Sequence, residues 1–303
     1  MTLSFDNSKD LKFVFTLGTG NFGSSSSGNT VTLQGFRAVV DIDKAGGAMM
    51  GTLRASIFGV KQSEMNSLTT IQWQPLAFIP NTVQIFAVDG DQTTLVFVGN
   101  IVNAWANYDN MPDVYLSIRA QAAYFSALQP ITPTAFSGPT DAVSLMQIVI
   151  GKINASINSG QPVYTFENNG VPFTPIKNPY YANTGLEQLK DIARDNNIWL
   201  YVDNTIIAIT PVNQPRIKFV PIISQTSGLK GYPTFDGVGV KFQMLFSPSV
   251  TFGGSVQILS PETPRAEGPW IVTSLSLKLE SAKPNGSWLM DIRGSKTGLA
   301  LSS

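Results

Sequence analysis

Apolar and polar residues alternate through most of the first 120 positions, which is the two-residue period of half-buried β-strands. In residues 114–119, for example, Val114, Leu116 and Ile118 would share one face of a strand. The sequence Asp89-Gly90-Asp91, between two such runs, is typical of a hairpin turn. We expect these strands to close into a barrel, because closure removes exposed sheet edges. The predicted strands are residues 12–17, 31–42, 50–60, 82–88, 94–105 and 114–119, with one short helix at residues 63–68.

A three- and four-residue spacing of apolar positions begins near residue 141 and predicts two helices. The first covers residues 141–157, with Thr140 placed to cap its N-terminus. The second starts at Thr184, and Glu187 three residues later completes the sequence signature of a capping box. A hairpin is predicted next, at residues 199–209, so this stretch forms a small α+β unit.

Strand-like alternation returns in the last third of the chain, at residues 238–246, 255–259, 270–280 and 287–293. Asn285-Gly286, before the last of these strands, is a strong hairpin signal. The predicted fold class is therefore mainly β with an α+β insert, and we expect each unit to bury its own core. Both β units end in long strands joined by tight turns, so a diverged duplication is a further hypothesis. The predicted domains are a first β-barrel at residues 1–128, a small α+β domain at 129–213 and a second β-barrel at 214–303.

The composition removes most enzyme classes. The 303 residues include no His and no Cys, which excludes His-dependent triads, thiol nucleophiles, disulfides and most transition-metal sites. We expect no enzyme activity, no catalytic residue, no cofactor and no metal. Only 13% of the residues are charged, and charge depletion is typical of subunit interfaces, so oligomerisation is one hypothesis. Twenty basic and twenty acidic residues argue against a broad nucleic-acid surface, and no export signal or membrane anchor is visible.

Carboxylates are the remaining candidates for chemistry. Glu262 and Glu267 could form a glycosidase-type pair, but their proline-rich surroundings favour a solvated loop. Asp89, Asp91 and Asp109 could suggest a cation site, but their spacing lacks the bidentate terminal Glu of a calcium loop. Turn formation is the stronger interpretation for these three aspartates.

Two glycine-containing loops are candidates for contacts with a neighbouring subunit. Residues 18–23 have the GxGxxG spelling of a dinucleotide site, but a serine run follows where that site needs a helix. Residues 18–28 are therefore either a solvated hairpin tip or an arm that orders against a neighbour. Residues 44–47 also have the composition of a hairpin tip. The candidate contact residues are Gly18, Asn21, Phe22, Ser25, Gly28, Lys44, Gly46 and Gly47.

The tryptophans leave a second function open, because flat aromatic rings stack on sugar faces. Four of the five fall within predicted strands, where packing in the core or an interface is the stronger interpretation. The alternative function is a carbohydrate-binding or adhesin-like β protein that uses exposed aromatics such as Trp73 and Tyr108. The four tryptophans within strands are Trp105, Trp199, Trp270 and Trp288.

The order of β-barrel, α+β unit and β-barrel, without catalytic apparatus, resembles the baseplate hub protein of contractile-tailed bacteriophages. It is also similar to the front half of type VI secretion spike proteins. The resemblance covers nearly the whole chain, and it rests on the order of its motifs and on the domain pattern. The stretches that contribute are residues 54–60, 96–105, 178–181, 228–235 and 268–275.

The resemblance implies a structural virion protein of the tail baseplate, assembled in the host bacterial cytoplasm. Three copies would form a homotrimeric ring, and the two tail-tube-like barrels of each copy would match a six-fold tail tube to a three-fold spike. The implied partners are further copies of the chain, the tail tube protein, the central spike protein and baseplate wedge proteins. Genome DNA would pass through the ring without specific binding during ejection, which suits a chain with no net charge.

Overall fold

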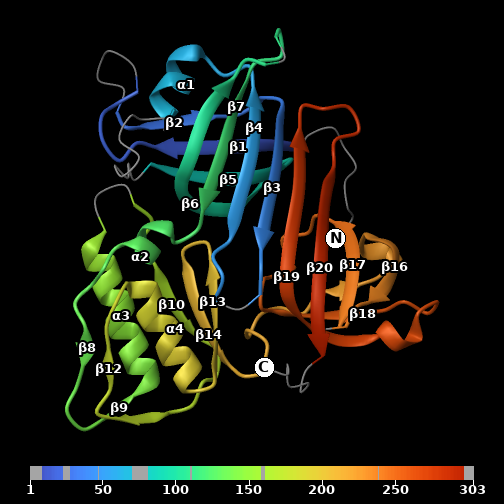
Figure 1. Cartoon of the computed structure of the whole chain (residues 1–303). Coiled ribbons are helices and arrows are strands. Elements are labelled where there is room, and N and C mark those ends of the chain that lie inside the picture. The colour runs from blue at the N-terminus through green and yellow to red at the C-terminus, as the bar shows by residue number, and fades with distance from the viewer. Residues whose placement is uncertain are drawn as a thin grey trace.

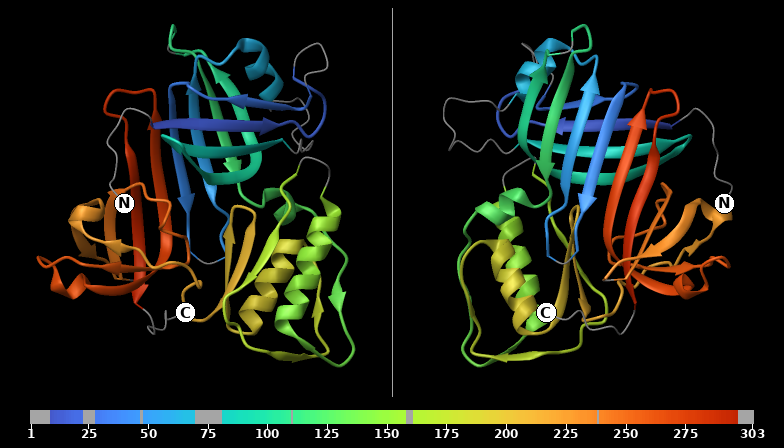
Figure 2. Two further views of the ribbon diagram at one scale, coloured as in Figure 1. Left: turned by 180° about the vertical axis from the view of Figure 1, so that it is seen from behind. Right: turned by 45° about the vertical axis from the view of Figure 1, so that its right-hand side comes forward.

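A large antiparallel sheet dominates the protein, as the computed structural model in Figure 1 shows. The structure describes residues 9–22, 28–46, 48–69, 81–109, 111–157, 161–237 and 239–296. The first third of the chain lies at the top of Figure 1, the α+β unit at the lower left and the last third at the right. The views of Figure 2 show the same three-part arrangement from behind and obliquely.

The first third contributes seven strands and one short helix to this arrangement. The helix is α1 (Gln62–Leu68), which buries Met65 and Leu68. The strands are β1 (Lys9–Thr16), β2 (Thr30–Leu33), β3 (Ala38–Lys44), β4 (Thr52–Phe58), β5 (Thr82–Asp89), β6 (Gln92–Asn107) and β7 (Tyr115–Gln121).

The last third contributes the other strands of the large sheet, together with the short 3-10 helices η1 (Gln225–Ser227) and η2 (Pro264–Ala266). Its strands are β15 (Ile222–Ile223), β16 (Leu229–Phe235), β17 (Val240–Leu245), β18 (Ser255–Ile258), β19 (Gly268–Ser281) and β20 (Trp288–Lys296). The main path of the sheet is β16-β17-β20-β19-β3-β4-β7-β6-β5-β1-β2, and β18 and β15 continue from β19 off this path.

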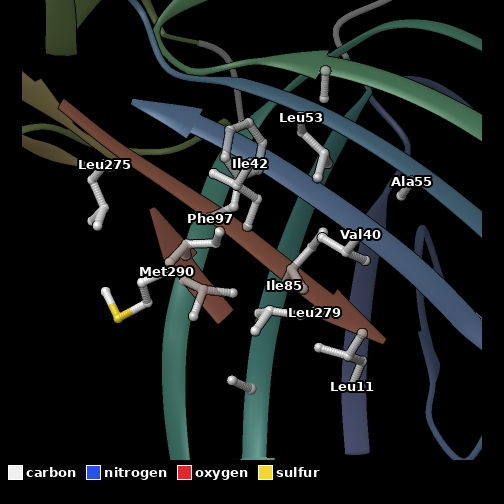
Figure 3. Close-up of a cluster of buried hydrophobic side chains, with 14 of the residues drawn as sticks. Leu11, Val40, Ile42, Leu53, Ala55, Ile85, Phe97, Leu275, Leu279 and Met290 are labelled. Atoms are coloured by element: carbon white, nitrogen blue, oxygen red, sulfur yellow. The ribbon is translucent and has the colours of Figure 1, made fainter. Parts of the chain in front are cut away.

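The antiparallel pairing of β3 with β19 joins the first and last thirds into one sheet, with Leu277 opposite Ile42. Among the described strands, β3 pairs with β4 of its own unit on one side and with β19 of the last unit on the other. Both thirds also share one hydrophobic cluster: Figure 3 shows Phe97 and Ile85 of the first unit together with Leu275 of the last. The expectation of a separate core for each β unit is therefore wrong, because two sheets joined edge to edge curve around the same interior.

The α+β unit has its own cluster of buried side chains, which includes Leu145 and Ile153 of the first long helix and Leu189 of the second. Its helices are α2 (Tyr124–Leu128), α3 (Ala142–Ser156) and α4 (Gly185–Asp195). Its strands are β8 (Thr134–Ala135), β9 (Pro139–Asp141), β10 (Thr165–Asn168), β11 (Pro175–Lys177), β12 (Tyr180–Tyr181), β13 (Ile198–Asp203) and β14 (Ile206–Pro211).

The predicted fold class, mainly β with an α+β insert between barrel units, is confirmed, and most predicted elements lie where the pattern placed them. The short elements α2, β15 and β8 to β12 were not predicted, and three further details differ. Asp141 and not Thr140 caps α3, because its carboxylate accepts the N–H of Ser144. The run 31–42 is two strands, interrupted at Gly35 with φ +79°. Strand β16 was not predicted, because Gly231 and Pro233 interrupt its alternation.

Candidate functional site

The solvent-facing side of the large sheet carries ordered rows of polar side chains across six strands, β17-β20-β19-β3-β4-β7. Directly paired residues point to the same side of a sheet, so the strand registers define this surface. Gln243 pairs with Asp291, Asp291 with Ser276, and Ser276 with Asp43. We call this surface the polar sheet face; its members are Asp41, Asp43, Thr52, Arg54, Ser56, Ser117, Arg119, Lys241, Gln243, Ser274, Ser276, Lys278, Glu280, Asp291 and Arg293.

Charges of both signs are mixed across the polar sheet face, with five basic and four acidic side chains among its members. Burial raises the pKa of Asp41. The neighbouring charges have opposing effects on it: Lys278 and Arg54 lower this pKa, whereas Asp43 and Glu280 raise it. The face is therefore close to neutral and strongly polar, so it can line a water-filled space without holding a polyanion.

A buried chain of ion pairs joins the three parts of the molecule, and we call it the junction network. Arg216, whose side chain is 1% exposed, donates from Nε to Oε1 of Glu167 (3.0 Å) and from Nη1 to Oδ2 of Asp203 (2.9 Å). Lys44 at the end of β3 donates to the other oxygen of Asp203 (2.6 Å), and Lys218 donates to Glu167 (2.8 Å). The last unit contributes the Phe252 carbonyl, which accepts from Arg216 Nη1 (2.8 Å).

The ionised form of each carboxylate is favoured within the junction network. Burial alone would raise the pKa of Glu167, but hydrogen bonds from Arg216, Lys218 and Asn169 outweigh it and lower the pKa to about 2. Burial acts in the same way on Asp203, and the charges and hydrogen bonds of Lys44 and Arg216 again lower its pKa. The network is charged at neutral pH, so removing any one member would leave an opposite charge without its partner.

The pH dependence of stability follows from Glu167. Its pKa is lower in the folded chain than the ordinary 4.5, so its contribution is fully present above pH 4.5 and is lost as the pH falls toward about 2. We expect the free energy of unfolding of the wild type to exceed that of Glu167→Gln at pH 6 and the two to converge as the pH falls to about 2. Urea titrations at several pH values measure this. Glu187→Gln, in an exposed pair on α4, is the control, and a wild-type advantage that is constant from pH 6 to pH 2 would contradict the assignment.

A second contact between the units centres on Asn100, a fully buried residue in the middle of β6. Its amide nitrogen donates to Oε1 of Gln161 (2.6 Å), and its oxygen accepts the N–H of Phe125 (3.1 Å). The preceding residue must be glycine, since a Cβ at Gly99 would lie 2.6 Å from the Gln121 carbonyl oxygen. This contact therefore also holds the α+β unit to the sheet, at a place separate from the junction network.

The predicted contact loop at residues 18–28 is partly anchored inside the molecule. Phe22 is 6% exposed and belongs to the large core, and its N–H donates to the carbonyl of Gly28 (3.0 Å). The Gly18 N–H donates to Asn81 Oδ1 (3.0 Å), whereas Asn21 and Gly28 are exposed. Phe22 is therefore corrected from a contact residue to a core residue. Ser25 lies outside the described residues.

The predicted contact loop at residues 44–47 also needs correction. Lys44 is 8% exposed and its ammonium is bonded to Asp203, so it belongs to the junction network and not to an exposed tip. A Cβ at Gly46 would lie 2.9 Å from the carbonyl oxygen of Thr273 in β19, so this residue packs against the sheet. Gly47 lies outside the described residues.

Sequence reasoning missed Asp203, Arg216 and Glu167, which the fold brings together from β13, the segment after β14 and β10. The one local signal was a pair of cations, Arg216 and Lys218, in the otherwise apolar residues 215–223. Such an arginine needs partners when it is buried, but the chain sequence does not say which carboxylates supply them.

The carboxylate candidates stay apart from this network. Glu262 and Glu267 are exposed, and Glu267 Oε1 accepts the N–H of Ser260 (3.1 Å). Asp89, Asp91 and Asp109 are exposed residues of turns. Within the part of the chain that the structure describes, no three His, Cys, Asp or Glu side chains gather as metal ligands would.

The aromatic candidates divide into buried and accessible rings. Trp270 and Trp288 are 4% and 5% exposed core residues, and Trp105 and Trp199 are half-buried. Tyr108 is 44% exposed and lines an open groove of about 450 Å³ beside Met65 of α1. Trp73 lies outside the described residues. None of the described helices is long and apolar enough to cross a bilayer.

The fold is shared with phage tail and secretion proteins at very low sequence identity. A 43 kDa tail protein of prophage MuSo2 from Shewanella oneidensis matches with a TM-score of 0.57 at 12% identity, over 95% of this chain and 98% of that one. A tail protein from Neisseria meningitidis matches with a TM-score of 0.58 at 9% identity, over 94% and 97% of the two chains. The E. coli c3393 protein, described as a type VI secretion component similar to T4 tail proteins gp27 and gp5, matches at 0.58 and 8% identity, over 86% and 73%.

Sequence comparison supplies the family. No curated protein sequence matches this chain significantly. The family model described as baseplate hub gp41, however, matches residues 26–286, which is most of the chain. The chain therefore belongs to the baseplate hub gp41 family and is a structural protein of a phage tail.

Proposed function

We propose that three copies of this chain form a ring in the baseplate of a contractile tail, joining the hexameric tail tube to the trimeric central spike. The pairing of β3 with β19 is the observation that carries this proposal, because it sets two barrel units edge to edge within one chain. Three such chains present six barrel units, so a three-fold assembly can match a six-fold tube.

The ring leaves a central channel for the genome, and the polar sheet face supports this part of the proposal. A channel wall must be wetted, and its charges must be balanced if duplex DNA is to pass without being retained. The mixture of Arg54, Arg119 and Lys278 with Asp41 and Asp291 meets both needs. The protein would act by docking and transmission, without enzyme activity and without specific DNA binding.

The proposed partners are the tail tube protein on one side of the ring, the spike protein on the other and wedge proteins around it. Assembly takes place in the host bacterial cytoplasm, before genome ejection. The division into domains at residues 1–128, 129–213 and 214–303 stays a proposal, with the two β domains sharing one core. Gly18, Asn21 and Gly28 stay proposed contacts with a neighbour.

The mass of the purified full-length chain in solution tests the ring. Light scattering should give about 98 kDa, which is three times the 32.7 kDa of one chain. A reconstruction of the tail particle should show the same copy number between tube and spike. A chain that stays at 32.7 kDa in solution and occupies the particle in any number other than three would overturn the proposal.

A further inference from the structure

The first and last β units repeat one strand topology, although their sequences have diverged. In each unit a long strand forms a hairpin with the strand after it, as β6 does with β7 and β19 with β20. In the first unit, β7 pairs with β4, which pairs with β3. In the last unit, β20 pairs with β17, which pairs with β16. The start of β6 pairs with β5, and the start of β19 pairs with β18. Strands β3 to β7 therefore correspond to β16 to β20 in order.

The correspondence extends to individual residues. Both hairpins have a register irregularity at the same place, between Ile101 and Asn103 in β6 and between Val272 and Ser274 in β19. Beyond it, Asn103 pairs with Arg119 and Ser274 pairs with Arg293. The paired starts of β5 and β18 read Thr-Val-Gln-Ile and Ser-Val-Gln-Ile. The two units thus align with a defined register.

One contact of the last unit has no counterpart among the described strands of the first. The second half of β19 pairs with β3, and Lys278 lies opposite Asp41. The equivalent part of β6 is residues 105–107, and no described strand other than β7 pairs with it. The counterpart of β3 is β16, which among the described strands pairs with β17 alone. One edge of each kind is therefore left over in every copy.

We propose that residues 105–107 of β6 pair, antiparallel, with the end of β16 from the next copy of the chain, repeating the contact between β19 and β3. This rests on the proposed ring. The internal alignment fixes the register: Asn107 lies opposite Thr234, as Lys278 lies opposite Asp41, and Ala106 lies opposite Phe235, as Leu277 lies opposite Ile42. The two edges are different surfaces, so the contact is head-to-tail and a ring closes it.

The exposure of the side chains agrees with this pairing. Leu277 and Ile42, which face each other within the chain, are 4% and 0% exposed. Their counterparts are Ala106, which is half-buried, and Phe235, which is 53% exposed on an edge strand. An aromatic side chain exposed at a core-equivalent position would be buried by the neighbouring copy.

The remainder of β16 carries features that discourage strand addition. Lys230 is exposed, Pro233 offers no N–H, and the register with β17 is irregular between Lys230 and Thr234. Thr234 and Phe235 lie beyond this irregularity. Pairing with another copy is therefore restricted to the end of β16 that the internal alignment selects.

Disulfide trapping tests the register directly, because the chain has no cysteine of its own. The full-length double variant Asn107→Cys/Thr234→Cys places two thiols at cross-strand positions, a separation that a disulfide can bridge. Oxidation with copper–phenanthroline should yield covalent trimers on a non-reducing gel. Each single variant should give none, since a head-to-tail contact never brings the same residue of two copies together.

Two matched variants control the experiment. Asp41→Cys/Lys278→Cys places the thiols at the equivalent pair inside the chain and should form an intrachain disulfide with no change in mass. Asn107→Cys/Lys241→Cys moves one thiol from the edge to β17 and should not cross-link. Trimers in light scattering without covalent trimers, while the intrachain disulfide forms, would overturn the pairing and leave the ring intact. A monomer in light scattering together with a copy number other than three in the tail particle would overturn the ring itself. Covalent dimers of a single variant would overturn the head-to-tail contact.

Discussion

Replacing Arg216 by Met should lower the free energy of unfolding by about 3 to 5 kcal/mol, the usual cost of removing one member of a buried ion pair. The guanidinium is 1% exposed and bonds both Glu167 and Asp203. Without it, Glu167 keeps the ammonium of Lys218 and the side-chain amide of Asn169 as partners, and Asp203 keeps Lys44. Urea unfolding followed by circular dichroism measures the loss.

Two variants control this prediction: one removes an exposed arginine, and the other also neutralises the carboxylate of Glu167. Arg194→Met removes an arginine that is 72% exposed beside Asp191, and should cost no more than about 1 kcal/mol. Adding Glu167→Gln to Arg216→Met should recover part of the loss, because a neutral amide tolerates the missing cation better than a carboxylate. A small cost for the single variant, with no recovery in the double, would show that the network does not hold the junction.

Replacing Phe97 by Ala should also cost about 3 to 5 kcal/mol, since the ring is fully buried and its removal leaves a cavity. Figure 3 shows this ring in the cluster that also contains Leu275 and Met290. Because the two β units share this cluster, we expect β4 and β20 to lose amide hydrogen-exchange protection together. Phe173→Ala, at a residue 75% exposed, should change little. Unchanged protection of β20, with loss confined to the first unit, would indicate separate cores.

These predictions concern contacts between distant parts of the chain, which are the contacts that matter for a hub. A subunit of the proposed ring between tube and spike needs its barrel units fixed to each other. The shared sheet, the shared core and the junction network each provide such a connection. The proposed pairing of β6 with β16 of the next copy would extend the same sheet around the ring.

The local pattern of residues was sufficient for most elements of the fold. Alternation located β7 and its buried face, and the Thr184 cap located the start of α4, where Thr184 Oγ1 accepts the N–H of Glu187 (3.4 Å). The hairpin signal at Asn285-Gly286 lies at the predicted turn between β19 and β20. Periodicity and turn chemistry act over a few residues, so a single sequence contains them in full.

The candidate site was less accessible from the sequence, as Lys44 and Phe22 demonstrate. Both lie in or beside loops of exposed composition, yet the first is paired with a carboxylate 159 positions away and the second is buried in the core. Burial of a loop residue depends on what packs over it, and nothing nearby in the chain specifies that. The absence of His and Cys, in contrast, limits the possible chemistry whatever the fold.

The sequence by itself determined most of the long strands, the two long helices, the order of the three units and the lack of titrating groups suited to catalysis near neutral pH. Only the tertiary structure decided that β3 pairs with β19, that one core serves both β units, and that Arg216 is the centre of a buried network. The physical reason is the range of each effect. Propensity and periodicity are local, whereas sheet order and the pairing of buried charges depend on which distant segments compete for the same edge or the same interior space.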